Sequence, residues 1–181
     1  MPTTTEVVIL KFQRNVNIED SSTKHGQARQ DTLKTVAAQP GYQRSFWTVV
    51  FGDGTTVWWL IDWDSYDAHK AFMDSKAYKP FQERAAIFLD LTTPPKPFHV
   101  NFWTPPSEVL KTGPVVELVT FYFPFDSDNA KIEEMQKKAI EGFRKAGGGP
   151  HAMAGGLVIE NELEIPSKPR HKTKAVTALL A

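Results

Sequence analysis

The side chain best suited to move a proton in this chain is His69, in the segment WDSYDAH at residues 63–69. An imidazole titrates near neutral pH, so His69 could act as a general acid or base. The alternative is structural: the ring could pack at the start of a helix and bond to the backbone, to Asp62 or to Asp67. We keep both interpretations and give the structural one more weight, because structural histidines outnumber catalytic ones.

Three of the five tryptophans come shortly before His69, at positions 58, 59 and 63. Indole rings could line an apolar cavity for a planar aromatic ligand, or they could be core. Alternate residues of a strand point to opposite faces, so Trp59 and Trp63 share one face and Trp58 takes the other. The three cannot all line one cavity, and we expect two of them to be core residues.

Further polar candidates lie on other predicted strands. His99 and Asn101 share the face of residues 98–103 that is opposite the phenylalanines. Together they could form a polar site inside a barrel, or they could line a dimer or interdomain seam. Arg44 is a second candidate anchor, because an oxyanion needs donors held in place beforehand.

No cofactor or metal is expected. The chain contains no cysteine, and its five histidines lack H-x-x-x-H or H-E-x-x-H spacing, so a zinc site is not predicted. A heme held by a single axial histidine is the remaining alternative, since it needs one histidine and an apolar cavity.

The composition indicates an ordinary folded protein. Of the 181 residues, 41% are apolar, and 21 basic residues balance 21 acidic ones, which does not favour nucleic-acid binding. The apolar runs fall short of the roughly 20 residues that cross a bilayer, and the N-terminal segment lacks the basic region of a signal peptide. We therefore expect a cytoplasmic protein with no membrane or nucleic-acid partner.

These candidate residues must be positioned by alternating strands and helices. In the first half we predict a strand at 6–14, followed by a helix at about 22–38 that is capped by Asp20, Ser21 or Ser22. A hairpin follows at 42–63, with its turn at 52–54. Then come a helix capped by Asp64 or Ser65, a helix at about 78–90 and a strand at 98–103. The order β-α-β-β-α-β is that of a ferredoxin-like, split βαβ unit.

The second half repeats the start of this pattern. We predict a strand at 114–123, a helix at about 129–147, and strands at 153–165 and 173–181. The expected domains are a complete repeat at 1–104, a proline-rich linker at 105–114 and an incomplete repeat at 115–181. An incomplete repeat leaves a sheet edge to be covered, which favours a homodimer.

The segments WDSYDAH at 63–69 and SKAYKPF at 75–81 resemble the antibiotic-biosynthesis-monooxygenase group of the dimeric α/β-barrel superfamily. This resemblance implies an α+β fold in which tandem ferredoxin-like repeats with antiparallel sheets form a barrel-type arrangement. It also implies that His69 lies near the mouth of a pocket. The superfamily holds cofactor-free oxygenases, heme-degrading enzymes, isomerases, cyclases and proteins without known activity, so fold does not settle function.

The resemblance implies a small-molecule enzyme of secondary or aromatic metabolism, such as a cofactor-independent monooxygenase or a related cyclase or isomerase. Such an oxygenase would deprotonate a bound phenol or enol, and the substrate carbanion would reduce oxygen directly. His69 would handle the proton, Trp59 and Trp63 would be walls, and Asn101 or Arg44 would anchor the apolar or aromatic ligand. The alternative is a non-catalytic ligand-binding or dimerisation protein on the same scaffold.

Overall fold

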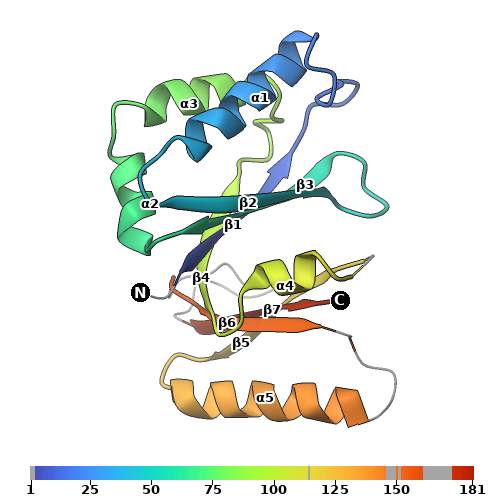
Figure 1. Cartoon of the computed structure of the whole chain (residues 1–181), viewed down its shortest axis with the longest axis vertical. Coiled ribbons are helices and arrows are strands. Elements are labelled where there is room, and N and C mark those ends of the chain that lie inside the picture. Colours follow the sequence, from blue (N-terminus) through green and yellow to red (C-terminus); the bar gives the residue numbers. More distant parts are fainter. Residues whose placement is uncertain (1–2, 114, 146–149, 151, 161–172) are drawn as a thin grey trace. The chain divides into compact units, whose positions relative to one another are not determined.

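The computed structural model describes residues 3–113, 115–145, 150, 152–160 and 173–181 (Figure 1). The chain divides into two compact units, Met1–Pro97 and Phe98–Ala181. This division falls a few residues before the expected repeat boundary at 104, which stays a prediction. Across the described ranges, no helix is both long enough and apolar enough to span a membrane.

The first unit is an antiparallel sheet with helices over one face. Its elements are β1 (Thr4–Lys11), α1 (Lys24–Ala37), β2 (Tyr42–Val49), β3 (Thr56–Trp63), α2 (Tyr66–Met73) and α3 (Tyr78–Ala85). β3 pairs with both β1 and β2, so the strand order is β2-β3-β1. Figure 1 shows α1 and α3 side by side over this sheet. The predicted hairpin and helices of this half are confirmed.

Helices α1 and α2 begin at side-chain caps. Thr23 caps α1, and its hydroxyl oxygen accepts a hydrogen bond from the Gly26 N–H at 3.0 Å. The expectation of Asp20, Ser21 or Ser22 as this cap is wrong, because Asp20 accepts hydrogen bonds from Ser22 instead. Ser65 caps α2, as one of the two predicted candidates, by accepting from the Ala68 N–H at 3.2 Å.

The β2–β3 hairpin turns where glycine and aspartate predict it. Gly52 has φ = 79°, a left-handed conformation that glycine adopts without steric cost. The Asp53 carboxylate accepts hydrogen bonds from both Thr55 and Thr56, which closes the loop onto the start of β3. The turn therefore sets the register in which Trp47 lies opposite Trp59.

The core of the first unit lies between the helix-covered sheet face and the helices. Trp59 and Trp63 point into it with 4% and 0% of their surface exposed, whereas Trp58 is half-buried on the opposite face. The other large core side chains come from every layer: Val8, Leu10, Phe12, Val36, Ile61, Phe72 and Phe88. The predicted alternation along β1 and β3 is confirmed.

The strands of the second unit pair antiparallel in the order β4-β6-β7-β5. Its elements are β4 (Lys96–Phe102), α4 (Pro106–Leu110), β5 (Glu117–Pro124), α5 (Asn129–Lys145), β6 (Met153–Val158) and β7 (Thr173–Leu180). Residues 161–165, predicted as part of a strand, lie outside the described residues, as do 146–147 at the predicted end of a helix. The segment expected as a linker carries α4, whose Val109 is fully buried.

Candidate active site

An apolar cavity of about 340 Å³ lies inside the first unit, between the sheet and the helices. This volume is at the low end of the range, roughly 300–1,000 Å³, that is typical of small-molecule sites. Its walls are aliphatic and aromatic, and Trp59 and Trp63 are among them. The polar groups on its lining are few, and Glu6, His69 and Tyr78 are the ionisable ones. A small aromatic molecule is the kind of ligand that such walls favour.

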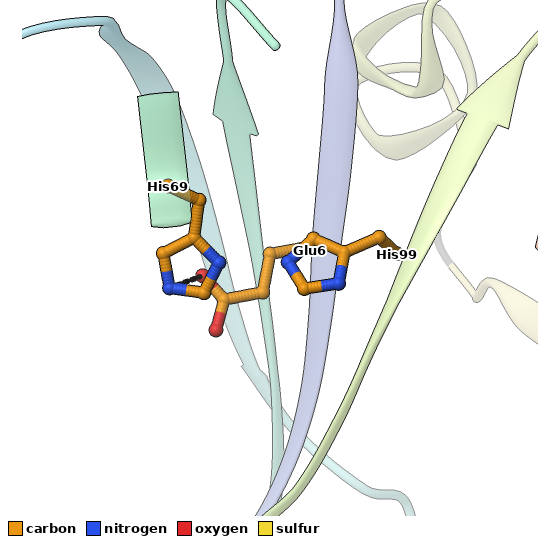
Figure 2. A group of neighbouring side chains, drawn as sticks. All are labelled: Glu6, His69 and His99. Atoms are coloured by element: carbon orange, nitrogen blue, oxygen red, sulfur yellow. Dashed lines mark ion pairs between the residues drawn. The ribbon is translucent and has the colours of Figure 1, made fainter. Parts of the chain in front are cut away.

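Glu6 and His69 both line this cavity. Figure 2 shows that their side chains point toward each other. Strand alternation places Glu6 on the same face of β1 as Val8 and Leu10, and the first turn of α2 carries His69. The Nε2 atom of His69 lies 3.4 Å from the Oε2 atom of Glu6. Both residues are buried, with 3% and 7% of their surface exposed. A carboxylate removed from water in this way requires such a partner.

Trp63 orients both members of this pair. Its indole Nε1–H donates to Glu6 Oε2 at 3.1 Å. Its ring also stacks on the imidazole of His69, with centroids 5.0 Å apart and an interplanar angle of 20°. Because one rigid, fully buried side chain contacts both groups, the carboxylate and the imidazole are held in one arrangement. Trp63 is therefore a positioning residue as well as a wall.

Tyr78 is a third ionisable group on the cavity lining. Burial, and then the negative charge of Glu6, raise the pKa of the Tyr78 phenol above its ordinary value of 10.0. Tyr78 can therefore present a neutral O–H donor at neutral pH.

The structure does not bring Arg44 to this cavity. Arg44 pairs with Asp62 in the same register in which Trp47 pairs with Trp59, and strand alternation puts Arg44 on the sheet face opposite Trp47 and Glu6. There its Nε atom lies 2.8 Å from Asp62 Oδ2, while the Thr5 hydroxyl donates to Asp62 Oδ1 at 2.6 Å.

His99 and Asn101 belong to the second unit, on β4. His99 is buried, and its Nδ1 atom lies 2.5 Å from Glu160 Oε1, while its backbone N–H donates to Glu160 Oε2 at 2.8 Å. Burial acts to raise the pKa of Glu160, but these hydrogen bonds outweigh it and hold the pKa below the ordinary value. Asn101 is exposed.

Sequence reasoning missed Glu6 and Tyr78. Glu6 precedes an apolar run and looked like an ordinary charge at its edge. Strand alternation could have identified it, because Glu6 lies on the same strand face as Val8 and Leu10, where a lone carboxylate would be buried. The ion-pair partner expected for His69 was Asp62 or Asp67. In the structure Glu6 forms that pair, and Asp62 is bound by Thr5 and Arg44.

No protein-family profile and no curated protein matches this sequence. A solved structure of a candidate monooxygenase from Fusobacterium nucleatum matches with a TM-score of 0.53 and 13% identity, over 99% of this chain and 76% of that one. SnoaB, a cofactor-independent oxygenase from Streptomyces nogalater, matches 55% of this chain and 89% of its own, with a TM-score of 0.41 and 13% identity. A candidate antibiotic biosynthesis monooxygenase from Nitrosomonas europaea covers 57% and 92%, with a TM-score of 0.45 and 14% identity.

The chain shares its fold with the candidate monooxygenase from Fusobacterium nucleatum. Its antiparallel sheets and β-α-β-β-α order fit the ferredoxin-like topology, so the predicted α+β fold class is confirmed. At 13% identity the likeness to the Fusobacterium protein establishes the fold alone, because one fold carries many unrelated activities.

Proposed function

We propose that the first unit binds a small planar aromatic molecule in its cavity and that the Glu6–His69 pair removes a proton from it. The observation that carries this proposal is the buried contact between Glu6 and His69 at the wall of an otherwise apolar cavity. Titratable pairs that are buried beside a cavity are typical of acid–base sites.

The reaction that fits best is a cofactor-independent oxygenation of an electron-rich phenol or enol. The pair takes a proton from the substrate, which leaves a delocalised carbanion. This carbanion transfers one electron to dioxygen, and the two radicals combine to a peroxide anion. The pair returns its proton to this anion to give a hydroperoxide, and loss of water yields a carbonyl. Overall, a CH₂ group and O₂ become a C=O group and H₂O, so the substrate supplies all the electrons.

The cavity walls and Tyr78 would support this step. An apolar lining excludes water, which strengthens the interaction of the anion with nearby donors. The neutral hydroxyl group of Tyr78 is such a donor, placed to stabilise an oxyanion as it forms. Trp63 keeps Glu6 and His69 in contact during the transfer, because it binds the carboxylate and stacks on the imidazole.

The test is oxygen uptake with a panel of phenols and enolisable fused-ring aromatics, with labelled dioxygen as the source of the product oxygen. We expect one labelled atom in the product. Glu6→Gln and His69→Asn should each lower kcat by about 10²- to 10⁴-fold, the usual contribution of general acid–base groups. His25→Asn is the matched control, because His25 lies on α1 outside the cavity lining.

The alternative function is that of a ligand-binding protein without catalysis. The hydrogen bond from Trp63 to Glu6 favours this alternative, because it also satisfies a buried carboxylate in a purely structural role. A panel member that binds tightly but produces no oxygen uptake would favour this alternative. Oxygen uptake that is unchanged in both Glu6→Gln and His69→Asn would overturn the assigned acid–base role.

A further inference from the structure

Three buried N–H groups of the first unit have no hydrogen-bond partner: Nε of Arg29, Nε1 of Trp47 and Nε1 of Trp59. Trp47 and Trp59 line the cavity, and Trp59 is 4% exposed. Buried donors are nearly always satisfied in folded proteins, because an unmade hydrogen bond destabilises the fold. Three such donors in one place therefore require an explanation.

The three donors form one contiguous cluster. Trp47 and Trp59 are direct partners across the β2–β3 pair, and their ring centroids are 5.8 Å apart. The guanidinium carbon of Arg29, on α1, lies 4.9 Å from the centroid of the Trp47 ring. Arg29 Nη1 lies 3.4 Å from a carboxylate oxygen of Glu19, whose side chain is 67% exposed. The Nε atom of Arg29 has no acceptor.

The cluster lies one step along the sheet from the acid–base pair. Val8 is the partner of Trp59 across β1–β3, and Glu6 is two residues from Val8 on the same face. Two residues of a strand span about 7 Å. The cavity thus has Glu6 and His69 at one part of its wall and Trp47 and Trp59 at the next, and the charge of Arg29 lies over the Trp47 ring, outside the lining.

We propose that Arg29, Trp47 and Trp59 form a subsite that binds an acceptor oxygen of the ligand, either a carbonyl or a carboxylate. The ligand is then an aromatic compound with its acceptor oxygen at this subsite and its acidic position at Glu6 and His69. This inference rests on the proposed function and adds which residues select and orient the ligand.

Calorimetric titration of the whole chain with three matched probes tests the subsite: naphthalene, 2-acetonaphthone and 2-naphthoate. The wild-type protein should bind the ketone and the carboxylate more tightly than naphthalene. Trp47→Phe or Trp59→Phe keeps a ring and removes one N–H group. Each should weaken both oxygen-bearing probes by about threefold to tenfold, which corresponds to one net hydrogen bond, and should change naphthalene affinity by less than about twofold.

Arg29→Gln distinguishes the two ligand chemistries. If Arg29→Gln lowers the affinity for 2-naphthoate more than the affinity for 2-acetonaphthone, the subsite binds a carboxylate. If it lowers both affinities equally, the subsite binds a carbonyl. Trp58→Phe is the matched control, because Trp58 lies on the opposite face of β3, and it should change none of the three affinities.

Two results would overturn the subsite. Oxygen-bearing probes that bind wild-type protein no more tightly than naphthalene would show that the donors select nothing. Equal weakening of all three probes by Trp59→Phe would show that the indoles are only walls. Both results leave the cavity and its acid–base pair intact. Failure of all three probes to bind wild-type protein would instead overturn the proposed function together with the subsite.

Discussion

His69 lies between an indole ring and a carboxylate. The Oε2 atom of Glu6 accepts from Trp63 and contacts His69, so a proton gained or lost by either ionisable group changes the field at the other. Substitution of Glu6 or of His69 should therefore change the dependence of activity on pH in a similar way.

Tyr78 supplies a prediction at this scale. Its raised pKa means that the folded protein holds the phenolic proton more tightly than the unfolded chain does. Its contribution to stability is thus complete below pH 10 and is lost as the pH rises through the higher folded pKa. Phenolate absorbance can be titrated against pH for the wild type and for Tyr78→Phe. We expect the difference between the two titrations to show a single ionisation above pH 10.

Unfolding measurements at alkaline pH provide the second check on Tyr78. The free energy of unfolding should fall less steeply above pH 10 in Tyr78→Phe than in wild type. A difference titration centred at or below pH 10 would contradict the raised pKa.

Helix α2 is the element on which the proposed chemistry depends, because it carries His69 one turn after its cap. Removing the Ser65 hydroxyl leaves the Ala68 N–H without its acceptor. We expect Ser65→Ala to lower the free energy of unfolding by about 1 kcal/mol, the usual cost of a lost cap. Because α2 then frays at the turn before His69, kcat with the accepted substrate should also fall.

Thr23→Ala is the matched control for this prediction. It removes the corresponding cap of α1, where the Gly26 N–H loses its acceptor. Its cost in stability should be similar, at about 1 kcal/mol, with kcat preserved. Equal losses of kcat in the two variants would show that general stability, and not the placement of His69, controls turnover.

At the scale of the whole molecule, Glu160 predicts how the protein responds to acid. Its folded pKa lies below the ordinary value of 4.5, because hydrogen bonds from His99 outweigh burial. The stability that it contributes is present above pH 4.5 and is lost as the pH falls through the lower folded pKa.

Denaturant unfolding at a series of pH values checks this behaviour. The free energy of unfolding of Glu160→Gln should fall less than that of wild type as the pH drops below 4.5. Glu134→Gln, which breaks an exposed pair with Lys138, should follow the wild-type curve. Parallel curves for Glu160→Gln and wild type would rule out this role of Glu160.

Several expectations at this scale stay predictions. These are a homodimer, a cytoplasmic location and the absence of a cofactor. They were expected from the composition, from the sheet edge that an incomplete repeat would leave, and from the resemblance of residues 63–81. Neither the fold nor the geometry of the first unit tests them. The repeat boundary at 104 has the same standing.

The sequence by itself determined the elements and their faces. Residues 6–14 and 55–63 are rich in apolar and β-branched or aromatic residues, and glycine and aspartate mark the hairpin turn. The β-α-β-β-α order, the separation of Trp58 from Trp59 and a helix start at Asp64 or Ser65 could therefore be predicted. These features depend on neighbouring residues, whose spacing is written in the chain.

The tertiary structure alone decided the partners. Glu6 and His69 are 63 positions apart, and only the β1–β3 pairing with α2 packed against it brings their side chains together. The partner of Arg44, which is Asp62, depends on the pairing of β2 with β3, and the unpartnered N–H groups of Trp47 and Trp59 depend on packing. Contacts of this kind arise from register and burial, which no local pattern encodes.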